Sequence, residues 1–156
     1  NGLQNKMKVR GYISTAFSCP YEGKTNRDLL IKISETLIKL GSYEISIGDT
    51  IGKATPDEVY EALKLLLNYV PKEKIAMHFH DTYGFALSNT VVALEMGIRN
   101  FDSSAGGLGG CPYAPGATGN VATEAVVDLV TKRGYETGLD HEKLIEVAQF
   151  AKELRS

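Results

Sequence analysis

Apolar positions recur along the chain in two alternating patterns, one typical of strands and one typical of helices. Short apolar runs bounded by turn formers alternate with longer segments whose apolar residues lie three and four positions apart. The clearest helix start is at Thr55, a capping hydroxyl followed by Pro56 and, three residues after the cap, by Glu58. The pattern predicts strands over Val9–Ser14, Glu44–Ile47, Ile75–His80 and Phe101–Ser104, and helices capped by Thr25 and Thr55 and over Ala86–Met96, Thr123–Arg133 and His141–Leu154.

This strand–helix alternation predicts an α/β fold with parallel strands joined by right-handed crossovers. Four such units can form an open sheet or half of an eight-stranded barrel. Polar residues come just after the ends of four successive strands, at Ser18-Cys19, Asp49, His80-Asp81 and Ser103-Ser104. Because sites in parallel folds lie at the carboxyl ends of strands, this placement favours a barrel mouth. Residues 1–156 show no domain boundary and are expected to form a single, partial barrel domain.

Composition excludes several classes of protein. The 156 residues are 43% hydrophobic and 23% charged, with a net charge of −2, so no basic excess points to a nucleic-acid partner. No apolar run is long enough to span a bilayer. Two distant cysteines are expected to be free thiols, which suggests bacterial cytoplasm or another reducing compartment. The N-terminus has no signal or transit pattern and no Met, which suggests a fragment or a processed product.

Two histidines on one strand form the first candidate site. Residues two apart on a strand point to the same side, so His78 and His80 share a face. Paired imidazoles at a strand end can bind a divalent or transition metal. Two hydrogen-bonded histidines at a polar strand end are the alternative. The third histidine, His141, is expected to be exposed at a helix start.

A carboxylate and a glycine-rich loop are further candidates. Asp49 follows a strand and either caps a turn or, at a barrel mouth, acts as a base or orients a hydrogen bond. The loop Gly106–Asn120 contains Cys111, which can serve as an acid, base or nucleophile, or can be an incidental thiol. The loop's composition suggests a lid over substrate. Asn120 can cap a helix or bind a cation.

These stretches together resemble the 3-hydroxy-3-methylglutaryl-CoA lyases, a family of metal-dependent barrel lyases. The glycine-rich loop around Cys111 is the most specific part of the resemblance. The matching stretches cover nearly the whole chain: Val9–Tyr12, Cys19–Lys24, Glu44–Gly52, His78–Gly84, Gly107–Ala114 and Gly119–Glu124.

The resemblance implies strands five to eight of a (β/α)8 barrel plus a C-terminal helix. It implies cleavage of the hydroxymethylglutaryl thioester to acetyl-CoA and acetoacetate, a divalent cation (Mg²⁺ or Mn²⁺), an acyl-CoA thioester as partner and a homodimer. No nucleic acid or membrane partner is expected. The implied roles are metal ligation by His78, His80 and Asn120, catalysis by Cys111, Asp49 and His78, and substrate binding by Arg10, Tyr12, Ser46 and Glu124.

The family's first strand, which carries an Arg-Asp pair, has no counterpart in this sequence. We therefore expect little lyase activity from the chain alone. Two alternatives stay open. One is a non-catalytic half-barrel that dimerises or binds, and the other is a Claisen-type acyl-CoA condensing enzyme of the same superfamily.

Overall fold

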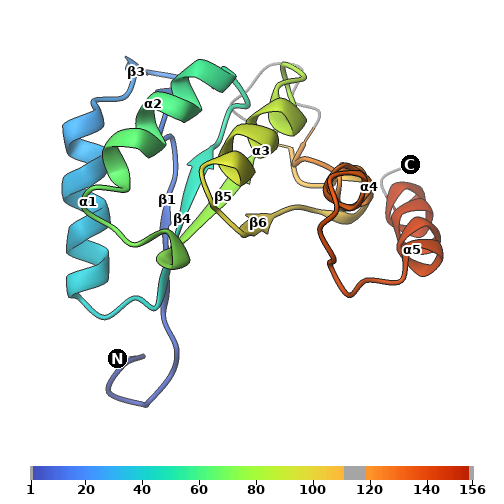
Figure 1. Cartoon of the computed structure of the whole chain (residues 1–156), viewed down its shortest axis with the longest axis horizontal. Helices are drawn as coiled ribbons and strands as arrows, with labels where there is room; N and C mark the ends of the chain where they lie inside the picture. Colours follow the sequence, from blue (N-terminus) through green and yellow to red (C-terminus); the bar gives the residue numbers. More distant parts are fainter. Residues whose placement is uncertain (1, 111–118, 155–156) are drawn as a thin grey trace.

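The computed structural model describes residues 2–110 and 119–154. Its main feature is a four-stranded sheet in which every neighbouring pair of strands is parallel (Figure 1). The order along the sheet follows the order in the sequence, as right-handed β/α crossovers predict. The strands are β1 (Arg10–Ile13), β4 (Glu44–Asp49), β5 (Ile75–Phe79) and β6 (Asn100–Asp102).

Helices connect these strands and cover one side of the sheet. In Figure 1, α1, α2 and α3 lie along one side of the strands, and α4 and α5 lie beyond β6. None of the described helices is both long and apolar enough to cross a bilayer. The helices are α1 (Arg27–Lys39), α2 (Pro56–Leu66), α3 (Ala86–Glu95), α4 (Thr123–Lys132) and α5 (His141–Glu153), with 3-10 turns η1 (Lys72–Lys74) and η2 (Ala105–Gly107).

The helix start at Thr55 is confirmed, and the start of α1 is corrected by one residue. The Thr55 hydroxyl accepts a hydrogen bond from the Glu58 amide, and the Glu58 carboxylate accepts one from the Thr55 amide. The N-cap of α1 is Asn26, whose side chain accepts from the Asp28 amide at 2.8 Å. Thr25 instead donates its hydroxyl proton to a backbone carbonyl across the adjacent loop.

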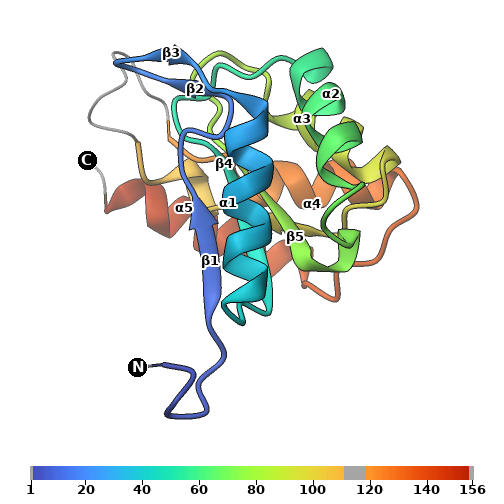
Figure 2. The same cartoon turned by 90° about the vertical axis from the view of Figure 1, so that its left-hand side faces the viewer.

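The segment predicted as a loop after β1 contains a small hairpin. Strands β2 (Ser18–Cys19) and β3 (Gly23–Lys24) pair antiparallel beyond the carboxyl end of β1 (Figure 2). Gly23 has a φ of +77°, which the absence of a Cβ makes inexpensive. The hairpin therefore forms a flap beyond the end of β1. The spacing of apolar residues did not predict it.

Alternation along the strands separates an apolar face from a polar face. Ile45 and Ile47 of β4 and Ile75, Met77 and Phe79 of β5 belong to the buried core under the helices. The residues between them point to the opposite face. That second face carries the charged and hydrogen-bonding side chains.

The polar face is concave. In a flat sheet the first and fourth strands would lie about 14 Å apart, since neighbouring strands are spaced by about 4.8 Å. The Arg10 guanidinium on β1 nevertheless reaches Asp102 on β6, with Nη1 2.9 Å from Oδ1. Side chains leave a flat sheet roughly at right angles, so a contact between its outer strands indicates that the sheet curls toward its polar face, as the wall of a barrel does.

Candidate metal centre

The parallel register brings four strands' polar side chains onto the concave face. Ser46 pairs with Ala76, two residues before His78, and His78 lies directly beside Asp102. Asp102 contacts side chains from the other three strands. Its Oδ2 accepts a hydrogen bond from the Ser46 hydroxyl at 2.6 Å and one from Arg10 at 3.0 Å.

Arg10 joins two carboxylates on this face. Its Nε donates to Glu44 Oε1 at 2.6 Å, while its Nη1 bonds Asp102. Burial raises the pKa of Asp102, but the contacts with His78, Ser46 and Arg10 outweigh it and lower the pKa to about 2. Asp102 is therefore a fixed negative charge at neutral pH.

His78 and His80 lie together, as their spacing predicted. Their ring centroids are 5.3 Å apart. The Nδ1 atoms of both rings are buried and make no hydrogen bond within the described part of the chain. Burial, with a smaller effect from His78, lowers the pKa of His80, so the neutral ring that binds metals is favoured.

Asn120 is held beside this pair by backbone and side-chain contacts. It forms an isolated antiparallel bridge with His80. Its Nδ2 donates to the carbonyl of Leu108 at 2.8 Å and to that of Gly109 at 3.3 Å. These bonds leave Oδ1 as a buried acceptor without a hydrogen-bond partner among the described residues.

The donor set therefore suits a divalent cation. A buried acceptor without a partner, such as Asn120 Oδ1, is rare in folded proteins and calls for an ion or water. Two imidazoles and one amide oxygen are compatible with Mg²⁺ or Mn²⁺ only if further oxygen ligands join them. Within residues 2–110 and 119–154, no three His, Cys, Asp or Glu side chains gather as a metal cluster.

The structure does not bring Asp49 to the concave face. Strand β4 runs through Asp49, which pairs with Phe79 and so points with it toward the helices. Its carboxylate accepts from the amides of Ala54 at 2.9 Å and Lys53 at 3.1 Å, and its side chain belongs to the buried set. This is the turn-capping arrangement, and a role for Asp49 in catalysis stays a prediction.

The remaining predicted residues occupy separate places. Tyr12 is exposed and lies against the Arg10 guanidinium, with which its hydroxyl is hydrogen-bonded. Glu124 accepts from the Gly106 amide at 3.1 Å and pairs with Lys152 of α5 at 3.3 Å, so it anchors the start of the glycine-rich loop. Cys111 lies outside the described residues. His141 is exposed, as expected.

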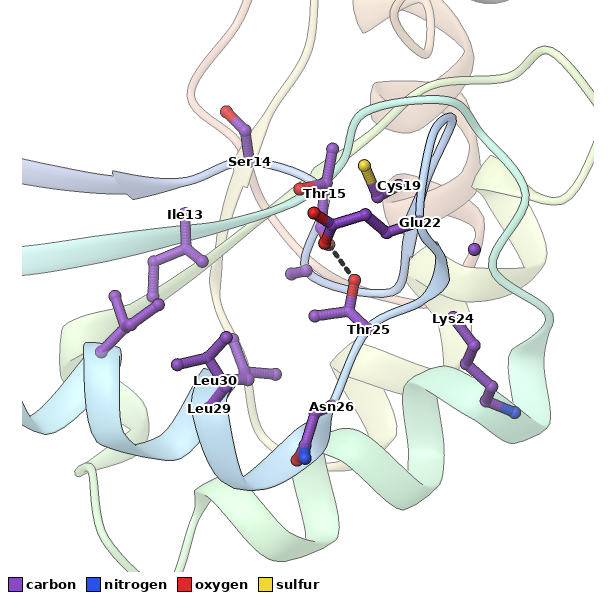
Figure 3. Close-up of a pocket in the computed structure, with 13 residues that line it drawn as sticks. Ile13, Ser14, Thr15, Cys19, Glu22, Lys24, Thr25, Asn26, Leu29 and Leu30 are labelled. Atoms are coloured by element: carbon purple, nitrogen blue, oxygen red, sulfur yellow. Dashed lines mark hydrogen bonds between the residues drawn. The ribbon is translucent and has the colours of Figure 1, made fainter.

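A separate cavity of about 330 Å³ lies between the end of β1, the β2–β3 hairpin and the first turns of α1. Figure 3 shows Leu29 and Leu30 on one side of it and Cys19 and Glu22 on the other. None of the paired histidines, Asn120 or Asp102 lines it. The cavity is therefore lined by residues other than those of the candidate metal centre.

The sequence profile of the HMGL-like family matches residues 5–151. The chain belongs to the HMGL-like family. It is similar to the mitochondrial hydroxymethylglutaryl-CoA lyase of Rattus norvegicus, with 50% identity over 144 residues, which are 92% of this chain and 44% of that protein. This chain thus spans about half the length of the curated relatives it matches.

Solved structures give the same family relationship. The HMG-CoA lyase of Brucella melitensis superimposes with a TM-score of 0.95 at 46% identity, over 99% of this chain and 54% of that one. The HMG-CoA lyase of Acinetobacter baumannii, solved in complex with coenzyme A and 3-methylmalate, gives a TM-score of 0.90 at 39% identity, over 97% and 50%. The parallel α/β fold of the HMGL-like family is therefore confirmed for this chain.

Two residues of the concave face were missed by the sequence reading, Asp102 and Glu44. Asp102 ends a three-residue strand, too short for a period-two pattern to mark its face. Glu44 opens a strand whose other members are largely apolar. Only the three residues together are informative, because the buried Glu44 and the half-buried Asp102 both need the cation that Arg10 provides.

Proposed function

We propose that this chain supplies the cation-binding wall of a lyase that cleaves 3-hydroxy-3-methylglutaryl-CoA to acetyl-CoA and acetoacetate. The observation that carries the proposal is the placement of the His78 and His80 rings, 5.3 Å apart, beside the buried and unpartnered Oδ1 of Asn120. Family membership and the coenzyme A and 3-methylmalate held by the Acinetobacter relative support an acyl-CoA substrate.

We further propose that the four β/α units are half of an eight-stranded barrel, strands five to eight of the whole. The sequential parallel order and the curl toward the polar face support this. In a closed barrel, that face points inward. The histidine pair, Asn120 and Asp102 would then line the barrel's interior near the carboxyl ends of the strands, where barrel enzymes place their sites.

Each residue on the face has a definite part in this proposal. His78, His80 and Asn120 hold the divalent cation. Mg²⁺ or Mn²⁺, when bound, lowers the cost of the alkoxide that forms from the substrate's tertiary hydroxyl. A histidine that binds a cation through Nε2 has no lone pair there for a proton, so the ligand role of His78 excludes a simultaneous role as base. We assign it the ligand role.

The proton transfers are assigned to Asp49 and Cys111, which are not among the proposed cation ligands. The hydroxyl proton must be removed and the acetyl-CoA enolate must be protonated for cleavage to finish. The pKa of Asp49 is raised to about 6, mainly by burial, which suits a proton acceptor near neutral pH. Its direction toward the helices requires a movement of the Asp49–Ala54 turn before it can serve. Cys111 is the proposed donor to the enolate.

A segment exchange tests this function by supplying the rest of the barrel from a relative. Residues 2–154 replace the matching half of the Brucella lyase, and acetoacetate release is measured with Mn²⁺. We expect the chimera to cleave 3-hydroxy-3-methylglutaryl-CoA. His78→Ala in the chimera should remove activity, while His141→Ala, an exposed histidine in α5, should retain it.

The alternatives give different results in the same assay. A non-catalytic half-barrel would yield a folded chimera with no turnover of any acyl-CoA. A condensing enzyme would leave the hydroxymethylglutaryl thioester intact but join acetyl-CoA to a keto acid. Either result would refute the lyase assignment.

We also propose that the chain works as a homo-oligomer in a reducing compartment. The free thiol of Cys19 within the described residues is compatible with the latter.

A further inference from the structure

We propose that Asp102 is a positioning residue that fixes the ring orientation and tautomer of His78. This inference rests on the proposed cation site, to which His78 would present its Nε2 atom. Asp102 itself is not a ligand in this arrangement. It acts through the imidazole, as carboxylates behind metal-binding histidines do.

The first observation is the placement of the two side chains. His78 and Asp102 are direct register partners on adjacent parallel strands. Asp102 Oδ2 lies 3.5 Å from His78 Nδ1. That nitrogen is buried and has no hydrogen-bond partner among the described residues. A shift of about 0.7 Å would bring the pair to the length of a charge-assisted hydrogen bond.

The second observation is that Asp102 is held in place from its other sides. Ser46 donates to Oδ2 at 2.6 Å, and Arg10 binds Oδ1 and Oδ2 at 2.9 and 3.0 Å. Arg10 is in turn fixed by Glu44 at 2.6 Å. The carboxylate therefore cannot rotate freely to follow the ring, and the ring must adjust to the carboxylate.

The charge of Asp102 decides which ring nitrogen carries the proton. An ionised carboxylate only accepts hydrogen bonds, so it favours a proton on the facing Nδ1. Neutral His78 then keeps its lone pair on Nε2. The same contact limits rotation of the ring about its bond to Cβ. Both effects prepare His78 for a cation before the cation arrives.

The tautomer can be measured directly in the metal-free protein. The chain has 3 histidines, so nitrogen-15 NMR of the imidazole rings at about pH 8 is readily assigned by comparison with His78→Gln. We expect His78 to carry its proton on Nδ1. In Asp102→Asn the ring should move to the Nε2-protonated form or to a mixture, and in Asp102→Glu the Nδ1 form should be partly restored.

Calorimetric titration with Mn²⁺ supplies the second measurement. Removing such a carboxylate weakens metal binding by about 10- to 100-fold, so we expect that loss in Asp102→Asn and a partial recovery in Asp102→Glu. Ser46→Ala, which removes one donor but keeps the charge, should give a smaller loss and guards against misfolding of Asp102→Asn. Asp128→Asn, at an exposed α4 carboxylate paired with Lys132, is the matched control and should bind as the wild type does.

The outcomes separate this inference from the proposed function. If wild-type His78 is protonated on Nε2, or if Asp102→Asn changes neither tautomer nor Mn²⁺ affinity, the positioning role is refuted. If the wild type binds no Mn²⁺, the proposed cation site fails, and the tautomer measurement alone decides whether Asp102 controls the ring.

Discussion

The Asp49 carboxylate shows how one buried side chain can serve stability. It ends β4, accepts the amides of Lys53 and Ala54, and so fixes the turn that leads to α2. Burial is the largest influence on it and raises its pKa to about 6. The amide hydrogen bonds favour the charged form but do not offset that burial. Asp49 thus takes up protons more readily in the native state than in the unfolded chain.

This shift predicts a specific pH dependence of stability. A carboxyl group whose pKa is higher in the native state stabilises the fold at low pH, and that contribution is lost as the pH rises from about 4 through about 6. The upward shift of the Asp49 pKa corresponds to about 3 kcal/mol across that window. Asp49→Asn should remove this part of the pH dependence in urea denaturation, while Asp57→Asn, an exposed carboxylate nearby, should keep it. Identical profiles for wild type and Asp49→Asn would contradict the account.

At the scale of elements, the start of α2 is the best-defined local signal. Thr55→Ala removes the hydroxyl that accepts the Glu58 amide, and we expect a loss of about 1 kcal/mol in the free energy of unfolding. Thr55→Ser should restore most of it, because the hydroxyl returns. Thr36→Ala, at an exposed position inside α1, is the control and should stay within about 0.5 kcal/mol of the wild type. Equal losses at Thr55 and Thr36 would remove the capping box as the cause.

Elements with a clear period were predictable, and elements without one were not. Strands β1, β4 and β5 and the five helices follow the spacing of their apolar residues, and the start of α2 also follows a capping signal; both are local properties. The β2–β3 hairpin has two residues in each strand, so no period exists to detect. The N-cap of α1 could not be predicted from the local sequence, since Thr25 and Asn26 are both good caps. In the structure the Thr25 hydroxyl donates to the Thr15 carbonyl, and Asn26 caps the helix.

The site divides in the same way. His78 and His80 were predicted together because a spacing of two fixes their common face. Asp102 depends on the register between two strands, which no local pattern contains. Asp49 was expected beyond the strand's end, but β4 runs further, and alternation then turns its side chain toward the helices. Contacts between elements therefore determine the positions of the site residues that the local sequence pattern did not predict.

At the scale of the whole molecule, β1 and β6 are the edge strands of the sheet, and neither pairs with a further strand within residues 2–110 and 119–154. Exposed strand edges invite pairing with another chain. Helix α5 also exposes Ile145, Val147 and Phe150. We expect the purified chain to sediment as a dimer or larger species at about micromolar concentrations, where exposed edges and apolar patches drive association. A single monomeric species would argue against the half-barrel proposal.

The half-barrel proposal also predicts low lyase activity for the isolated chain. The described residues offer two imidazoles and an amide oxygen to the cation, with no carboxylate among the proposed ligands. We therefore expect the chain alone, supplied with Mg²⁺ or Mn²⁺, to release acetoacetate far more slowly than the segment-exchange chimera. Equal rates would mean that these four strands form a complete site.

The most direct test of the central claim is calorimetric titration of the purified chain with Mn²⁺. The account predicts that the wild type binds the ion and that His78→Ala weakens binding by at least about 10-fold, because an imidazole ligand is lost. His141→Ala, on an exposed surface, should leave the affinity unchanged. An affinity that is the same in wild type and His78→Ala would contradict the claim that the concave face is a metal centre.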